Sequence, residues 1–177
     1  MSAADDKRRS LIDRLTDHVL DHGLAGASLR PLARAAGTSD RMLLYYFADK
    51  AALIEALLGN VAARLTAELE TLAARPPLPA GVLARELPAL ATAEPLWRYM
   101  KLWLEVAALA ARGDTTCATV GGAIGRDFVA WIEARIAGDP ARRASEAALL
   151  LQLIDGALVL KSAGLDDVLA LTARSTP

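Results

Sequence analysis

Residues 28–58 read SLRPLARAAGTSDRMLLYYFADKAALIEALL, and this stretch holds two short helix signals separated by a glycine. Ser28 and Ser39 are both good helix N-caps, because a serine hydroxyl can accept a hydrogen bond from an unpaired N–H of the first turn. Gly37 lies between the two signals, where a tight turn needs a backbone conformation that glycine adopts freely. The pattern predicts a helix-turn-helix, whose second helix can enter the major groove of DNA.

Composition and hydrophobic spacing predict an all-α fold for the rest of the chain. Alanine and leucine, two strong helix formers, supply 69 of the 177 residues, and only 5% of residues are aromatic. Apolar stripes at helical spacing, with glycine, proline and capping residues at their ends, mark the helices. They predict an N-terminal three-helix unit at 7–22, 29–36 and 40–47, and a long fourth helix from about residue 49 to 75. After a proline cluster at 76–81, they predict a C-terminal helical bundle at 82–93, 95–112, 118–137 and 141–163, with a short turn at 168–173.

The residues of the helix-turn-helix also occur in the order of one family of DNA-binding proteins. Their order, Ala33, Ala36, Gly37, Ser39, Tyr46, Phe47 and Lys50, resembles the N-terminal domain of TetR-family transcriptional regulators, closely over residues 8–58. Beyond residue 58 only the architecture of long helices agrees. The resemblance implies a helix-turn-helix DNA-binding domain at 1–49 and an effector-binding and dimerisation domain at 50–177. It implies a dimeric repressor that a small-molecule effector releases from a pseudo-palindromic operator.

Candidate DNA contacts lie on the second and third helices and at the start of the fourth. They are Ser28, Arg30, Thr38, Ser39, Arg41, Met42, Tyr45, Tyr46 and Lys50. Arg41, Tyr45 and Tyr46 have the reach to meet base edges or phosphates, whereas Leu43 and Phe47 are expected to anchor the helix in its own core. Lys7, Arg8 and Arg9 are a candidate basic arm. Composition alone favours a core role for the Tyr-Tyr-Phe run, and only the ordered match favours DNA contact for Tyr45 and Tyr46.

Aromatic residues of the C-terminal part mark a candidate effector pocket. The expected lining residues are Trp97, Met100, Trp103, Leu104 and Phe128, and the expected ligand is an apolar small molecule. The alternative is that these side chains only pack a helical core. Arg98 and Glu105 are expected to be solvated surface charges, and Cys117 a small buried apolar residue.

A helix that is apolar around most of its circumference is buried on two faces, and residues 144–163 have this property. In a domain of this size, a second copy of the chain is the simplest cover for the second face. The predicted dimer interface comprises Ile124, Trp131, Ala148, Leu149, Gln152, Leu153, Gly156 and Leu160. Asp155 is a further candidate for setting the register, and the spacing of Gly121 and Gly125 would allow helices to approach closely there.

Charge and motif content exclude several other classes of protein. Residues 1–60 carry eight basic and eight acidic side chains, and the whole chain has a net charge of −1, so DNA binding would rest on a few placed groups. No phosphate-binding glycine loop or nucleophile pattern indicates an enzyme, and no cofactor is predicted. His18 and His22, with Asp17 or Asp21, are a weak alternative metal site, because histidine also suits a helix C-terminus.

The cellular location and the main functional alternative also follow from the sequence. The longest uncharged stretch, residues 115–125, is far shorter than the roughly 18 to 20 residues that span a bilayer, so no membrane association is predicted. The N-terminus lacks the apolar region of a secretory signal, and a lone cysteine cannot form an internal disulfide, so we expect a cytoplasmic protein. The alternative function is an all-α ligand-binding or structural bundle without DNA recognition.

Overall fold

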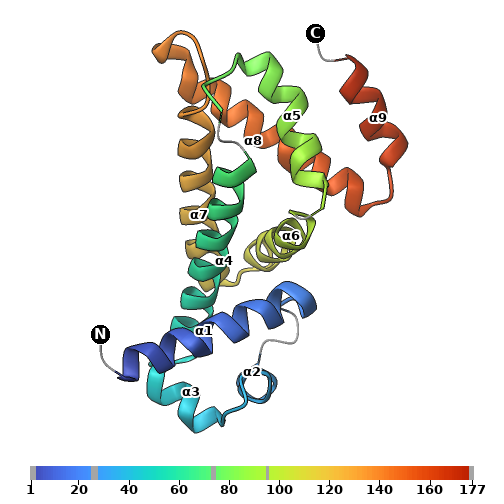
Figure 1. The fold of residues 1–177 in the computed structure, drawn as a ribbon. Helices are drawn as coiled ribbons and strands as arrows, with labels where there is room; N and C mark the ends of the chain where they lie inside the picture. Colours follow the sequence, from blue (N-terminus) through green and yellow to red (C-terminus); the bar gives the residue numbers. More distant parts are fainter. Residues whose placement is uncertain (1–2, 25–27, 73–74, 95, 176–177) are drawn as a thin grey trace.

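A computed structural model describes residues 3–24, 28–72, 75–94 and 96–175. The regular secondary-structure elements in these residues are all helices (Figure 1). The N-terminal unit comprises α1 (Ala3–His22), α2 (Leu29–Ala35) and α3 (Asp40–Tyr46). The remaining elements are α4 (Lys50–Leu72), α5 (Ala80–Thr92), α6 (Trp97–Ala111), α7 (Thr115–Glu133), α8 (Pro140–Ser162) and α9 (Asp166–Ser175). The predicted all-α architecture, with a helix-turn-helix, a long fourth helix and a C-terminal bundle, is confirmed.

The N-terminal unit packs around a small core of leucines and one phenylalanine. Leu11, Leu15, Leu32 and Leu43 are fully buried, and Phe47 is 3% exposed. Gly37 lies two residues after the end of α2 in a left-handed conformation with φ of +64°, which lets α3 begin three residues later. The helices α1 and α2 therefore hold α3 at the lower edge of the molecule, away from the bundle (Figure 1).

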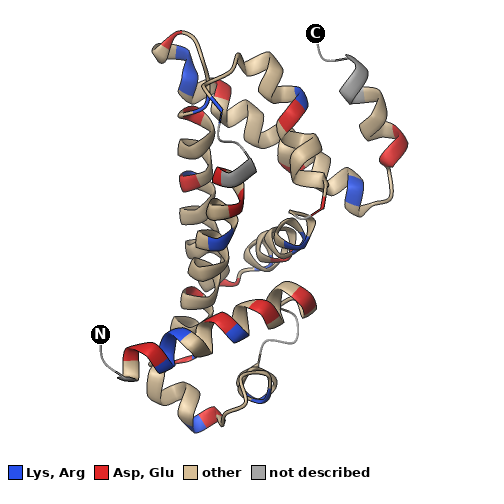
Figure 2. Cartoon of the chain, viewed as in Figure 1, with Lys and Arg blue, Asp and Glu red and all other residues tan. Residues whose placement is uncertain are grey.

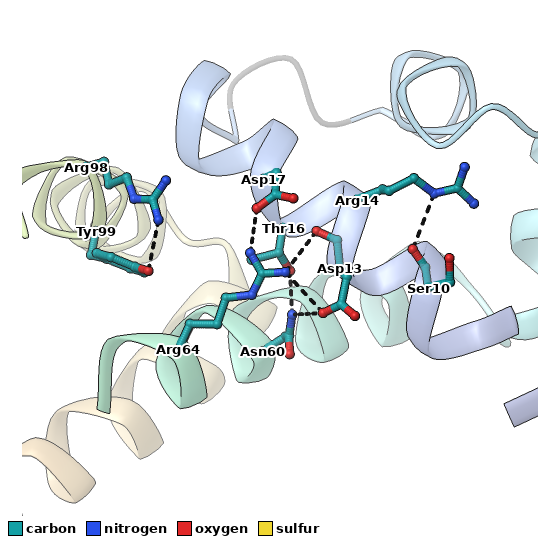
Figure 3. A network of polar contacts seen from close by, with 9 residues as sticks. All are labelled: Ser10, Asp13, Arg14, Thr16, Asp17, Asn60, Arg64, Arg98 and Tyr99. Carbon is teal, nitrogen blue, oxygen red and sulfur yellow. Dashed lines mark hydrogen bonds and ion pairs between the residues drawn. The ribbon is translucent and has the colours of Figure 1, made fainter. Parts of the chain in front are cut away.

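Polar contacts along the length of α1 fasten it to α4 (Figure 3). The Arg64 guanidinium donates to the Asp17 carboxylate and, at 3.1 Å, to Asp13. The Asn60 amide donates to Asp13 and, at 2.9 Å, to the buried Thr16 hydroxyl. Partial burial disfavours the guanidinium charge, but the hydrogen bonds and charges of Asp17 and Asp13 outweigh burial and raise the pKa of Arg64. A movement of α4 is therefore transmitted to α1.

A second contact joins the N-terminal unit to α6. The Glu105 carboxylate accepts a 2.7 Å hydrogen bond from the backbone N–H of Leu24, just after α1. Glu105 is half-buried, so its prediction as a solvated surface charge is wrong. The reason is that α1 packs against α6, a contact between distant segments that the helical pattern does not show.

This contact leaves no room for a side chain at Gly23. Its φ is +77°, and a Cβ there would lie 2.6 Å from Glu105 Oε2. We expect Gly23→Ala to lower the free energy of unfolding by about 2 kcal/mol, because alanine costs roughly 1–2 kcal/mol in this conformation and the carboxylate must also move. Urea denaturation with an unchanged slope checks the value.

Gly59→Ala provides the matched control for that substitution. Gly59 lies within α4, and a Cβ there would meet nothing within 4 Å. We expect this change to stabilise the fold by about 0.5–1 kcal/mol, through the higher helix propensity of alanine. In the double variant Gly23→Ala with Glu105→Ala, the strain should remain while the clash is relieved. Equal stability of Gly23→Ala and the parent would contradict the account.

The C-terminal bundle is built on α8. Its buried face, comprising Ala147, Leu150, Ile154, Ala157 and Leu158, packs against α5, α6 and α7. The long helices α4 and α7 lie side by side, and α6 crosses between them and α8 (Figure 1). No helix in the described part of the chain is long and apolar enough to cross a membrane.

Several helix boundaries differ from the predicted ones, and local hydrogen bonds explain most of them. Asp114 accepts from the Cys117 N–H and starts α7 three residues early. The same helix ends at Glu133 instead of 137, because Leu78 pairs its backbone with Arg135 and Ala137. The segment predicted as a short turn is the ten-residue helix α9. The predicted end of α4 near residue 75 falls partly outside the described residues.

Candidate nucleic-acid interface and ligand cavity

The exposed face of α3 is the candidate for contact with DNA. The Ser39 hydroxyl caps the helix by accepting the Met42 N–H at 3.2 Å. Leu43 and Phe47 point into the core, which confirms their predicted anchoring role. Arg41 and Met42 are exposed, and Tyr45 is 74% exposed, an unusual value for an aromatic side chain without a partner surface.

The two adjacent tyrosines have different surroundings. Tyr46 is half-buried against the hydrophobic core, and its ring meets the Tyr45 ring edge-on with centroids 5.1 Å apart. Tyr45 thus contacts Tyr46 while most of its own side chain stays exposed. Leu44, for which the sequence indicated no role, is 43% exposed beside Tyr45. Its position in the sequence, directly before the predicted contact Tyr45, was the feature that could have marked Leu44 as part of the interface.

The other predicted DNA contacts lie in the segments before and after α3. Ser28 occupies the N-cap position of α2, but its side chain makes no capping hydrogen bond, contrary to the prediction. Arg30 is exposed and Thr38 half-buried. Lys50 is exposed at the first residue of α4. The Cys117 amide holds the pKa of Asp114 below its ordinary value, and the charge of Lys50 adds to that effect, so Lys50 also lies near the α6–α7 turn.

The predicted basic arm is part of a helix. Because α1 begins at Ala3, Lys7, Arg8 and Arg9 are helical, and the Arg8 guanidinium lies 4.8 Å from the centre of the Phe47 ring. Acidic residues alternate with basic ones over the N-terminal unit (Figure 2). This surface therefore offers individual cations in fixed places and no broad basic field.

The two histidines stack on each other near the end of α1. Their ring centroids are 4.4 Å apart, and His22 Nδ1 lies 3.0 Å from the His18 carbonyl oxygen. Asp17, a suggested partner ligand, binds Arg64 instead. Among the described residues, no three histidine, cysteine, aspartate or glutamate side chains gather as a metal site requires.

A cavity of about 640 Å³ lies between α4, α6, α7 and α8. Of the predicted pocket residues, Met100, Trp103 and Phe128 line it. Trp97 and Leu104 do not: Trp97 lies under the Lys161 ammonium, 4.9 Å from its ring centre, and Leu104 packs partly buried against the core. The α6 residues that meet the cavity are Tyr99, Met100, Leu102, Trp103 and Val106.

Two residues predicted for the dimer interface line this cavity instead. Ile124 and Trp131 lie on the side of α7 that faces inward. The Trp131 ring stacks on Phe128 and under the Arg135 guanidinium, and its Nε1–H donates to Glu70 of α4 at 3.0 Å. The hydrogen bond from Arg135, with that from Trp131, holds the pKa of Glu70 below its ordinary value.

The small residues of α7 serve the same inward packing. A Cβ on Gly121 would lie 3.1 Å from Val106 Cγ1, and one on Gly125 would lie 3.6 Å from the Trp103 ring. The two glycines thus let α6 approach α7 within one chain. Cys117 is buried as predicted, and burial raises the pKa of its thiol.

The outer face of α8 carries the remaining candidates for a dimer interface. Leu149 is 59% and Leu153 50% exposed, and a Cβ on Gly156 would meet nothing within 4 Å. Ala148 and Gln152 are exposed on the same helix, and Leu160 is half-exposed. Asp155, proposed to set the register, faces the cavity and accepts the Trp103 Nε1–H at 3.0 Å. The α8 face, comprising Ala148, Leu149, Gln152, Leu153, Gly156 and Leu160, is a mostly apolar surface whose residues are exposed or half-exposed in the described part of the chain.

Comparison of sequences supports the assignment of the N-terminal unit. Residues 19–57 match the bacterial regulatory proteins of the tetR family. The chain is 36% identical over 59 residues to the HTH-type transcriptional regulator BetI of Klebsiella pneumoniae (strain 342), across 33% of this chain and 30% of BetI. It is 35% identical over 85 residues to BetI of Escherichia coli O127:H6 (strain E2348/69 / EPEC), across 48% of this chain and 42% of that protein. The similarity thus spans less than half the length of these relatives.

Comparison of structures extends the likeness to the C-terminal bundle. A transcriptional regulator from Rhodococcus sp. Rha1 superposes with a TM-score of 0.69 at 26% identity, across 89% of this chain and 86% of the other. Salmonella enterica GusR has a TM-score of 0.63 at 20% identity, across 89% and 84%, a likeness of fold alone. The helix-turn-helix unit thus matches the tetR family of bacterial regulatory proteins, and the chain as a whole shares the fold of a transcriptional regulator.

Proposed function

We propose that this protein is a DNA-binding transcriptional regulator, a dimeric repressor that a small-molecule effector releases from a pseudo-palindromic operator. The observation that supports DNA binding best is the division of α3 into two faces. Leu43 and Phe47 anchor one face, while Arg41 and the 74% exposed Tyr45 project from the other. A rigid helix that presents an arginine and a tyrosine suits the major groove. The relatives called BetI are HTH-type transcriptional regulators, which agrees with this proposal.

The residues of the proposed interface divide into two roles. Arg41 and Tyr45 reach base edges, and Met42 and Leu44 offer apolar surface to thymine methyl groups. Phosphate contacts come from Ser28, Arg30, Thr38, Ser39 and Lys50, with Tyr46 supporting the Tyr45 ring. The Ser39 hydroxyl accepts the Met42 N–H, so its own hydrogen is left to donate to a phosphate oxygen.

The cavity supplies a route from the effector to the DNA-binding unit. The helix α4 lines it with residues between Glu55 and Leu69 and also carries Asn60 and Arg64, which hold α1. The helix α6 lines it through Trp103 and Val106 and carries Glu105, which holds the Leu24 N–H. An effector that displaces either helix therefore shifts the N-terminal unit and changes the distance between the two α3 helices of the dimer.

The division of labour that we propose follows the chain. Residues 1–49 bind DNA, and residues 50–177 bind the effector and form the dimer through the α8 face. We further propose a cytoplasmic location, where DNA and a small-molecule effector are both accessible, and a regulatory role without catalysis.

A mobility-shift assay on the DNA that flanks the coding region of this protein tests the proposal. We expect a specific complex whose affinity falls as salt rises from 50 to 200 mM, because phosphate contacts release counterions. Since residues 1–60 are neutral overall, unrelated DNA should bind weakly. No shift on any segment of that region at low salt would favour the alternative, an all-α ligand-binding or structural bundle without DNA recognition.

A further inference from the structure

The charged side chains that line the cavity are all acidic. Its lining includes the carboxylates of Glu55, Asp127 and Asp155, and among the described residues that line it there is no lysine, arginine or histidine. Glu55 and Asp127 are exposed, and Asp155 is half-buried. Arg135, which stacks on Trp131, is paired with Glu70 at 2.7 Å, so its charge is compensated outside the lining. The cavity therefore attracts cations and repels anions.

Asp155 is the carboxylate placed for direct contact with a ligand. It projects from α8 into an otherwise apolar part of the cavity, beside Ile154, Leu158 and Leu151. Its Oδ1 accepts the Trp103 Nε1–H, and within the described part of the chain it makes no ion pair. Burial raises the pKa of Asp155, against the smaller opposite effect of the Trp103 hydrogen bond. A charge that is desolvated without a counter-ion gains most from a cationic partner.

One aromatic ring contacts this carboxylate, and others share the cavity lining with it. Trp103, which is oriented by its hydrogen bond to Asp155, lines the cavity with Tyr99 and Phe128. The Trp131 ring is already in contact with Phe128 and with the Arg135 guanidinium, so we do not count it among the rings that hold the ligand. Aromatic faces beside a carboxylate bind organic cations through ring quadrupoles and charge together.

From this arrangement we infer that the effector of this protein is a hydrophobic organic cation, held by Asp155 and the rings of Trp103 and Phe128. This inference rests on the proposed function and replaces the expectation of an apolar effector with a more specific class. The cavity volume of about 640 Å³ lies in the range of roughly 300–1,000 Å³ that suits drug-sized ligands.

Tetraphenylphosphonium and tetraphenylborate test the inference, because they have nearly the same size and shape and opposite charge. Calorimetric titration of the full-length protein, without DNA, should give tetraphenylphosphonium an affinity at least about tenfold higher than that of tetraphenylborate. Equal affinities would show that the cavity binds by apolar contact alone and would overturn the inference. Absence of binding by the phosphonium would overturn it as well.

Asp155→Asn and Asp21→Asn assign the preference to one carboxylate. The asparagine at 155 keeps an oxygen that can accept the Trp103 Nε1–H, so the packing is preserved. We expect it to weaken phosphonium binding about tenfold and to leave borate binding unchanged or stronger. Asp21→Asn removes an equal charge from an exposed position on α1 outside the cavity and should change neither affinity. Equal effects of the two variants would contradict a contact with Asp155.

The thermal stability of the Asp155→Asn variant distinguishes a lost ligand contact from misfolding. A carboxylate whose folded-state pKa is raised destabilises the fold as pH rises above its ordinary pKa. Asp155→Asn should therefore raise the thermal midpoint at pH 7 even though it weakens the phosphonium complex. A lower midpoint together with weaker binding would attribute the loss to misfolding and overturn the assigned role.

The DNA assay and the ligand assay test the regulator proposal and the cation inference independently of each other. Phosphonium binding at the Asp155 site without any DNA complex would leave this inference standing and overturn the proposed regulator. A specific DNA complex that no cation dissociates would retain the DNA-binding proposal and overturn the cation as effector.

Discussion

Replacing Leu153 by glutamate is expected to dissociate the proposed dimer and to lower its affinity for operator DNA about a hundredfold. Leu153 is 50% exposed in the middle of the α8 face, beside Leu149. In a two-fold symmetric interface, one substitution places two carboxylates against an apolar surface. Each subunit would then bind its half-site alone and lose the gain of roughly 10² or more that linked binding provides.

Sedimentation at micromolar concentration and a mobility shift measure the two consequences separately. Ala89→Glu is the matched control, because Ala89 is exposed on α5 and lies outside the α8 face. It should leave both the dimer and the DNA complex unchanged. A parent protein that sediments as a monomer, or a Leu153→Glu variant that remains dimeric, would reject the α8 face as the interface.

The second large effect is expected from Arg41→Ala on the exposed face of α3. An arginine that contacts a base edge is worth about 1–3 kcal/mol per site, and a dimer uses it twice. The variant should therefore bind the operator about a hundredfold more weakly and discriminate less at one base pair of each half-site. Its fold should be retained, because Arg41 is exposed.

Arg85→Ala separates a base contact from a general loss of charge. Arg85 is exposed on α5, at the opposite end of the molecule from α3 (Figure 1), and its removal changes the net charge equally. We expect it to change DNA affinity by less than about threefold at 100 mM salt, because exposed charges beyond roughly 10 Å are largely screened. If Arg41→Ala and Arg85→Ala weaken binding alike, Arg41 makes no specific contact.

Local patterns in the N-terminal unit were sufficient to predict its structure. The capping of α3 by Ser39, the left-handed turn at Gly37 and the burial of Leu43 and Phe47 all depend on neighbours within a few residues. Such features are properties of the chain itself, because capping and turn geometry involve adjacent backbone groups. The same reasoning failed for the first residues of α1, where a helix forms in place of an arm.

Local sequence patterns could not predict the contacts between segments that are distant in the chain. Hydrophobic spacing identified apolar faces on α6, α7 and α8, but not which neighbour covers each face. Ile124 and Trp131 were therefore placed in a dimer interface although they face the cavity, and Trp97 and Leu104 were placed in the cavity although they pack elsewhere.

By itself, the sequence determined the helical fold, the helix-turn-helix and the family that this N-terminal unit matches, because spacing, caps and glycine turns act locally. Only the tertiary structure decided what surrounds each side chain. It placed Asp155 against Trp103 inside an acidic cavity and Glu105 against the N–H of Leu24, pairs that lie 52 and 81 residues apart in the chain. The physical reason is that the meaning of a charge depends on its burial and its partner, and helix packing sets both.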